Sequence, residues 1–463
     1  MFTEIILDCF YYVLIGNLCC IALLSGLRIY FIEKSSSSEY ISLNSDEPFV
    51  SIHYAICDEP PIMVLDTLNS FRALEYSNFE VIIVSNNHTN EHSWKPIEAF
   101  CQSFTNFHFF HFDKIDGFKA GALNIALDKM SSNCEYIFTV DADYQLKPSA
   151  LKIAVGTLIA KGVDLLQFPQ DYRNVCDHTE GLQVNYKHYF ECYLSSMDVS
   201  KTALPTGTLS LIKTGVFRTG LKWPSSTITE DAHFGINLLS NGFKIGFSNI
   251  SIGLGTMPTT VVDYSKQSKR WVFGNFQTLI LTLRQTRLSI KKKFKLYTML
   301  SAWINLLAIP IIITFITIPL IFIYPEALFQ LYLLIFLSVM YHALTQMYIL
   351  NITSMGNWRS TLKAFLIHTG TIEIGAFYWL TYFIKRDKPF IRTNKYLVSS
   401  NNSLIFYLLP ILLFVASIAL VIVGKTYLWM ILFPISVVAM IGKIQLENEL
   451  AYSKLNLFQT MMK

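Results

Sequence analysis

Hydrophobic residues form long runs near the two ends of this chain and only short runs in between. The first long run covers residues 5–32, and four more follow residue 290, at 296–323, 328–350, 404–423 and 427–441. About 20 consecutive apolar residues suffice for a helix that crosses a bilayer. The pattern therefore predicts membrane-spanning helices on both sides of a more polar central region, residues 47–290.

Short apolar runs of strand length alternate with helical stretches in the central region. We expect strands at 49–56, 80–84, 107–112, 136–140 and 165–168. This alternation is typical of an α/β fold with a mostly parallel sheet, whose ligands bind at the carboxyl ends of the strands. The polar residues that follow these strands are Asp58, Asn86, Asn87, Asp141 and Asp143.

The charged residues indicate which side of the membrane this domain faces. Only 15% of the residues are charged, against about 25% in an ordinary soluble chain. The net charge of +4 is too small to indicate a nucleic-acid partner. Lys and Arg instead gather beside the apolar runs, at 28–34, 291–295, 359–363 and 385–395. Such clusters mark cytoplasmic flanks, so we expect a cytosolic central domain and an N-terminus outside.

One apolar stretch, residues 362–384, has basic residues at both ends. A single crossing would place one basic end outside, so we favour an interfacial or re-entrant segment over a spanning helix. The chain then crosses the membrane five times. The expected organisation is an N-terminal transmembrane helix (1–34), a cytosolic α/β domain (47–260), interfacial amphipathic helices (261–295), a transmembrane hairpin (296–350), an interfacial or re-entrant segment (351–400), a second hairpin (401–445) and a cytosolic tail (446–463).

Asp141 and Asp143 follow the strand 136–140 directly. Two carboxylates one residue apart at a strand end can share a hard cation and a diphosphate. Neutralising a departing diphosphate is what sugar transfer from a nucleotide donor requires, which makes Mg²⁺ or Mn²⁺ the expected cofactor. Most Asp-x-Asp triplets in proteins lie in surface turns. The buried strand that precedes this one favours a metal-binding and diphosphate-binding role instead.

Two further motifs stand where helices are expected to begin. In the loop 117–124, two Gly allow close backbone approach and Lys119 can meet a phosphate, although a simple loop before a helix has the same pattern. Thr229, Glu230 and Asp231 satisfy the rules for capping a helix. Asp231 is equally suited to act as a general base for an acceptor hydroxyl.

Gln267, Arg270 and Trp271 have the spacing of one helix face. Trp offers a plane on which a sugar can stack, and Arg can contact a phosphate in bidentate fashion. Lys266 and Lys269 beside them would also suit an amphipathic helix on a membrane surface.

Together, the order and spacing of these motifs resemble the processive family 2 glycosyltransferases, the cellulose, hyaluronan and chitin synthase group, and especially bacterial β-glucan synthases. The resemblance covers about residues 48–285. It implies a GT-A catalytic domain, Rossmann-like with a mostly parallel sheet, inserted between transmembrane helices. Residues 390–395 also resemble the gating loop of cellulose synthases, with Phe390, Thr393 and Lys395 in place and Arg392 where that family has Val.

The resemblance implies roles for individual residues. Asp143 is the metal ligand, Asp231 is the base, and Glu230 and Asp141 complete the catalytic set. Acceptor binding falls to Trp271 and Asp231. The implied donor-binding residues are Asp58 at the uracil, Asn87, Lys119, Asp141, Gln267, Arg270 and Trp271.

The implied function is inverting, processive transfer from a UDP-sugar, with UDP-glucose as the best candidate, to a growing β-linked polysaccharide that leaves through the enzyme's own channel. The resemblance also implies a multi-pass protein of the bacterial inner or plasma membrane. A non-processive enzyme that glycosylates a lipid is the alternative, and a non-catalytic transporter or scaffold is a weaker one. UDP release would separate enzyme from scaffold, and product length would separate the two enzymes.

Overall fold

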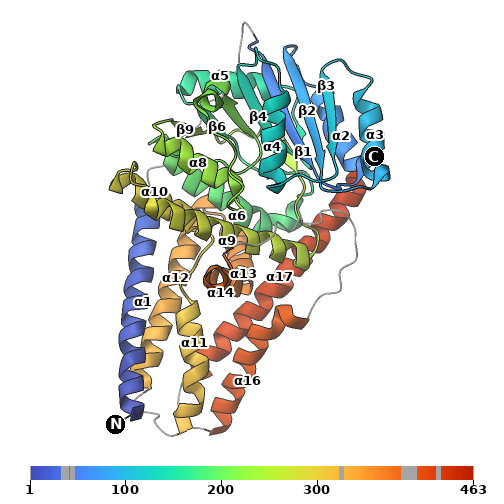
Figure 1. Ribbon diagram of the computed structural model, residues 1–463. Coiled ribbons are helices and arrows are strands. Elements are labelled where there is room, and N and C mark those ends of the chain that lie inside the picture. Colours follow the sequence, from blue (N-terminus) through green and yellow to red (C-terminus); the bar gives the residue numbers. More distant parts are fainter. Residues whose placement is uncertain are drawn as a thin grey trace.

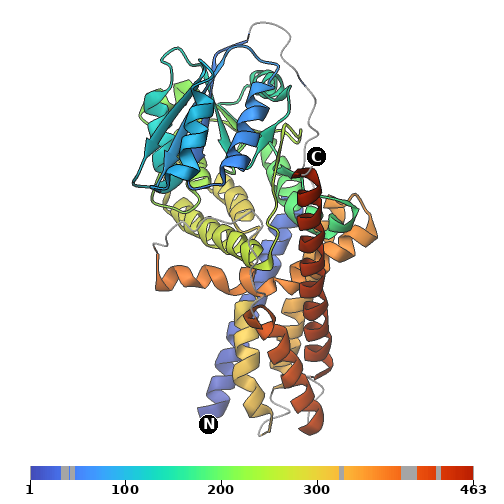
Figure 2. The same ribbon diagram turned by 90° about the vertical axis from the view of Figure 1, so that its right-hand side faces the viewer.

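An α/β domain stands on a stalk of long helices (Figure 1 and Figure 2). The computed structural model describes residues 2–32, 41, 47–322, 328–386, 404–423 and 429–461. The gating-like residues 390–395 lie outside these ranges.

The α/β domain is built on a seven-stranded sheet in the order β3-β2-β1-β4-β8-β6-β9. The strands β1, β2, β3 and β4 are mutually parallel, whereas β8 runs antiparallel to its neighbours β4 and β6. All five strands expected from the sequence are present. The sheet strands are β1 (Val50–Ile56), β2 (Phe79–Asn86), β3 (Phe107–Phe112), β4 (Tyr136–Asp141), β6 (Leu165–Gln167), β8 (Ser210–Lys213) and β9 (Ile245–Phe247).

Helices cover the sheet, so its central strands are buried on both faces. In β1, Val50, Ile52 and Tyr54 are fully buried. The helices of this domain are α2 (Pro61–Arg72), α3 (Glu91–Cys101), α4 (Phe118–Lys129), α5 (Ala150–Lys161) and α8 (Glu230–Ser240). A small second sheet contains β5 (Gln145–Leu146), β7 (Asp171–Tyr172) and β10 (Gly253–Gly255).

Several helices lie between the sheet and the stalk. They are α6 (Glu180–His188), which continues through a π-helical stretch (Tyr189–Leu194) into α7 (Ser195–Asp198), and α9 (Val261–Arg284) and α10 (Ile290–Leu300). Thr260 caps α9 by accepting a hydrogen bond from the Asp263 amide at 3.2 Å. Helix α9 lies across the top of the stalk, beneath the sheet (Figure 1).

Four helices among the described residues are long and apolar enough to cross a membrane, which indicates a membrane protein. They are α1 (Phe2–Ile32), α12 (Phe329–Thr353), α16 (Leu408–Val423) and α17 (Trp429–Met461). Helix α17 is continuous past residue 445, the predicted boundary between the second hairpin and the cytosolic tail, and that boundary stays a prediction.

The expected span 296–323 is divided, which corrects the sequence-based expectation. Helix α10 ends at Leu300, a turn follows, and the shorter α11 (Ala308–Thr317) begins after it. Polar side chains of α1 hold this turn. Arg28 donates to the Ile304 carbonyl at 2.9 Å and also to that of Ser301, and Asn17 donates to the Leu306 carbonyl at 3.0 Å.

The ambiguous stretch 362–384 is a chain of short helices, namely α13 (Trp358–Gly370), α14 (Ile372–Phe377), a 3₁₀ turn (Tyr378–Leu380) and α15 (Thr381–Ile384). Its later part runs across the stalk rather than along it (Figure 2). Gly370 and Gly442 allow α13 and α17 to touch, since a β-carbon on Gly370 would lie 2.5 Å from the carbonyl carbon of Gly442. The expectation of a non-spanning segment remains a prediction.

Candidate functional site

A cavity of about 350 Å³ opens at the carboxyl ends of β1, β2 and β4, with α9 as one of its walls. Residues from five separate stretches of the sequence meet there because the ends of parallel strands share one edge of the sheet. The predicted site residues that line it are Asn86, Asn87, Lys119, Asp141, Asp143, Glu230, Asp231, Gln267, Arg270 and Trp271.

Asp58 is placed differently from the other predicted donor residues. Its neighbours Cys57 and Glu59 belong to the cavity lining, whereas Asp58 does not. The backbone at Asp58 has a φ of 57°, and its carboxylate accepts a hydrogen bond from the Ser93 hydroxyl at 2.8 Å. This turn directs the side chain toward Ser93 on α3, and the expected uracil contact stays a prediction.

Lys119 connects the acidic groups of the cavity. Its ammonium group forms an ion pair with Asp141, lies 3.7 Å from Glu230, and donates to the Gly207 carbonyl at 2.7 Å. Burial alone would lower the pKa of Lys119, but Asp141 and Glu230 raise it above its usual value. Lys119 therefore stays charged.

Asp231 lies at the start of α8. Burial and then the neighbouring Glu230 raise its pKa to about 7, although Lys119 opposes this shift. One carboxylate oxygen accepts from the Ala232 amide at 2.8 Å. A carboxylate with a pKa near the working pH is well matched to general-base chemistry.

The carboxylates around Asp143 suit a metal ion that binds together with the substrate of the protein. Asp143 is 5% exposed, and the Thr256 amide donates to its carboxylate at 3.0 Å. No group of three or more His, Cys, Asp or Glu that could hold a metal occurs among the described residues. Mg²⁺ is often bound by only one or two carboxylates, with substrate phosphates and water completing its shell, and Asp141 and Asp143 fit that arrangement.

An aromatic cluster forms the other side of the site. The Tyr186 hydroxyl donates to Gln267 at 2.6 Å. The Trp271 ring packs edge-on against Tyr186, with ring centroids 5.7 Å apart, and lies 4.7 Å from Trp303. A second cavity of about 60 Å³ runs between these rings and Tyr189, and shares Asp231 and Trp271 with the larger one.

Sequence reasoning missed Gly207, Tyr186 and Trp303. Gly207 has a φ of +84°, and a β-carbon there would lie 2.9 Å from an Asp231 oxygen and 3.2 Å from the Lys119 ammonium. The only signal for Gly207 was a Pro-Thr-Gly turn, and no motif surrounds Tyr186 or Trp303.

Comparison with known proteins places this geometry in context. Residues 136–345 match the family described as Glycosyl transferase family group 2. A cellulose synthase catalytic subunit of Dictyostelium discoideum is 27% identical over 171 residues, 35% of this chain and 16% of that protein. Probable glucomannan 4-beta-mannosyltransferase 7 of Oryza sativa subsp. japonica is 26% identical over 188 residues, 38% of this chain and 32% of that protein. The chain thus spans less than two thirds of these curated relatives.

A solved structure shares the fold of the α/β domain. Mannosyltransferase PcManGT from Pyrobaculum calidifontis, in complex with GDP-Man and Mn²⁺, matches with a TM-score of 0.53 at 15% sequence identity. The match covers 76% of this chain and 99% of that one. The fold is therefore of the GT-A type.

Proposed function

We propose that this chain is a glycosyltransferase, as its match to a family 2 model over residues 136–345 and its glycosyltransferase relatives support, and that it is an inverting, processive enzyme. It would build a β-linked polysaccharide from a UDP-sugar, with UDP-glucose the first candidate. The observation that carries the proposal is the position of Asp231. Its carboxylate lines both the cavity beside Lys119 and the aromatic cavity beside Trp271. A base for this transfer must stand between donor and acceptor.

The described residues supply the parts of a single displacement. Asp231 takes the proton of an acceptor hydroxyl whose oxygen attacks C1 of the donor sugar, and the bond from C1 to the diphosphate breaks. Lys119 and Arg270 hold the negative charge that develops on the diphosphate. Asp141 and Asp143 would hold Mg²⁺ or Mn²⁺, which supplies further charge neutralisation when bound.

Processive synthesis requires that the acceptor end stays at the site after each transfer. Trp303 lines both the aromatic cavity beside Asp231 and a third cavity, of about 50 Å³, whose other lining residues include members of α1, α6, α9, α12, α13 and α14. A chain of sugars that left along these cavities would pass into the helical stalk. We propose this route for the product, with the catalytic domain on the cytosolic side of the plasma membrane.

The test is a panel of nucleotide sugars offered to the purified full-length protein. The relatives include both cellulose synthases and mannosyltransferases, so the panel contains UDP-glucose, UDP-GlcNAc, UDP-glucuronate and GDP-mannose. We expect nucleotide release with one donor only and a product of many sugar units that resists α-glycosidases. Products one or two sugars long on a lipid would contradict processivity. A protein that releases no nucleotide from any donor would contradict the proposal that this chain is an enzyme.

A further inference from the structure

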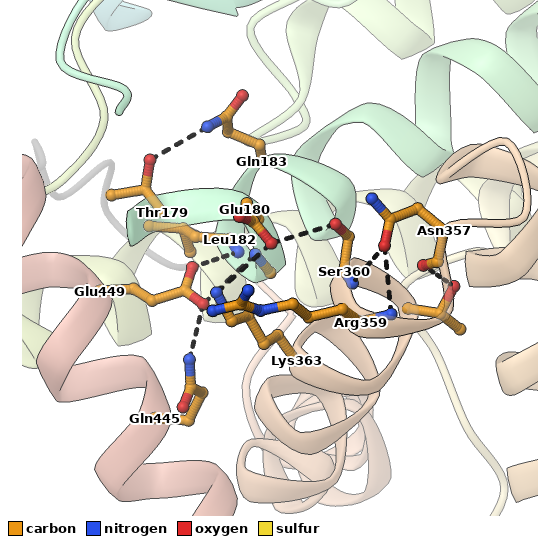
Figure 3. A network of polar contacts seen from close by, with 12 residues as sticks. Thr179, Glu180, Leu182, Gln183, Asn357, Arg359, Ser360, Lys363, Gln445 and Glu449 are labelled. Atoms are coloured by element: carbon orange, nitrogen blue, oxygen red, sulfur yellow. Dashed lines mark hydrogen bonds and ion pairs between the residues drawn. The ribbon is translucent and has the colours of Figure 1, made fainter. Parts of the chain in front are cut away.

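Helix α17 is bonded to the catalytic half of the protein through a buried carboxylate. Glu449 of α17 is 1% exposed. It accepts hydrogen bonds from two backbone amides in the first turn of α6, from Leu182 at 2.7 Å and from Gly181 at 3.2 Å. Gln445, one turn earlier on α17, donates to the same carboxylate at 2.8 Å (Figure 3). The first amides of a helix have no partner within it, so Glu449 caps α6 from a different part of the chain.

The start of α6 is held closely on its other side as well. Glu180 accepts from Ser360 at 3.1 Å and lies 3.3 Å from the Lys363 ammonium, both on α13 (Figure 3). A β-carbon on Gly181 would lie 2.7 Å from Glu449 and 2.8 Å from the β-carbon of Lys363. The N-terminus of α6 therefore has no room to shift between α13 and α17.

The same helix carries Tyr186 to the candidate site. Tyr186 donates to Gln267 at 2.6 Å and packs against Trp271. Leu182, Tyr186 and Tyr264 share one apolar cluster with Leu446 and Leu450 of α17, and Trp271 packs against it. One continuous set of contacts thus runs from α17 through α6 to the aromatic wall of the cavity.

Packing alone does not explain a charged group at this place. Burying a carboxylate is costly unless hydrogen bonds satisfy it, and an apolar residue would dock two helices without that cost. A carboxylate at a helix N-terminus also has a fixed direction, because it favours the positive end of the helix and accepts from particular amides. This geometry fixes both the rotation of α6 about its own axis and its position along that axis.

We propose that Glu449 is a positioning residue that holds Tyr186 against Gln267 and Trp271, so that the acceptor hydroxyl meets the donor before water does. The inference rests on the proposed function. Lys119 and Asp141, which we assign to the donor, come from other elements, so the principal donor contacts do not pass through α6.

The experiment compares full-length wild type with Glu449→Gln, Tyr186→Phe and the double variant, in detergent, with the nucleotide sugar that the panel identifies. The readout is the ratio of polymer formed to free monosaccharide released. This ratio does not depend on how much of each protein is folded. We expect Glu449→Gln to lower it about tenfold with nucleotide affinity within twofold of wild type, and the double variant to resemble Tyr186→Phe, since residues that act through one another are not additive.

Glu447→Gln is the matched control, because this neighbouring carboxylate on α17 makes no hydrogen bond to α6 among the described residues and should leave the ratio unchanged. If Glu449→Gln loses nucleotide binding, Gln445→Leu replaces it, since it removes one of the three hydrogen bonds that orient the Glu449 carboxylate and leaves the two to α6. It should lower the ratio by a smaller factor. An unchanged ratio, or single effects that multiply in the double variant, would overturn the proposal. A wild-type protein with no turnover on any donor would instead refute the proposed function.

Discussion

Gly207 stands against Asp231 so closely that a β-carbon at position 207 would lie 2.9 Å from the nearer carboxylate oxygen. The carbonyl of Gly207 also accepts a hydrogen bond from Lys119. One glycine therefore contacts both the residue that we assign as the base and the residue that we assign to the diphosphate.

Gly207→Ala should reduce transfer by at least tenfold, since its φ of +84° strains any other residue and its methyl group would displace Asp231. Such misplacement near the reacting atoms can cost about 10²-fold. The measurement is kcat/KM for nucleotide release. Gly215→Ala is the control, because nothing lies within 4 Å of a β-carbon there. Equal activity of the two variants would contradict the role of Gly207.

The pH dependence of the reaction should report Asp231. Because its pKa is raised to about 7 and only the ionised form accepts a proton, kcat/KM should fall about tenfold per unit as the pH drops below 7 and level off above it. Lys119 lowers this pKa, so Lys119→Met should shift the acid limb to higher pH. Asp231→Asn should lose about 10²–10⁴ in rate yet still bind nucleotide. A wild-type profile that is flat from pH 5 to 8 would remove Asp231 from the role of base.

Metal dependence should follow Asp143. We expect EDTA to abolish nucleotide release, and Mg²⁺ or Mn²⁺ to restore it. Asp143→Asn keeps an oxygen for the Thr256 amide but halves the charge of the Asp141–Asp143 pair, so it should need at least tenfold more metal for half-maximal activity. Asp128→Asn, at an exposed site on α4, should behave like wild type. Undiminished activity in EDTA would exclude the cation from the reaction.

The position of the short helices 358–384 can be tested by cysteine labelling. With the eight native Cys replaced, Met355→Cys and Lys385→Cys place one thiol at an exposed site near each end of this segment. A segment that does not cross the membrane leaves both thiols on the cytosolic side. An impermeant reagent added to intact cells should then label neither, and should label both once the membrane is opened. Labelling of Lys385→Cys alone in intact cells would make the segment a true crossing.

Local patterns predicted the sheet and most of the site. Asp141 and Asn86 could be placed because a strand ends there, and the ends of parallel strands meet at one edge. Asp58 also follows a strand, but its left-handed backbone turns the side chain toward Ser93. Nothing in the sequence marks that turn, because the residue there is not glycine.

The features that the sequence did not predict depend on contacts between distant residues. Tyr186 reaches Gln267 across 81 positions in the chain. The break after Leu300 interrupts a run that hydropathy alone predicts as one span, and it is held by side chains from α1. Hydropathy measures composition along the chain and carries no information about such partners.

The bond from Arg28 to the turn after Leu300 also constrains how the protein is made. The residues it joins are separated by 273 positions. At about 5–20 residues per second, translation needs tens of seconds to cover that distance. During this interval α1 is already complete, while the carbonyl groups that Arg28 and Asn17 will bond do not yet exist. The newly made helix therefore waits with two polar side chains that have no partner in this turn until the residues after Leu300 have been made.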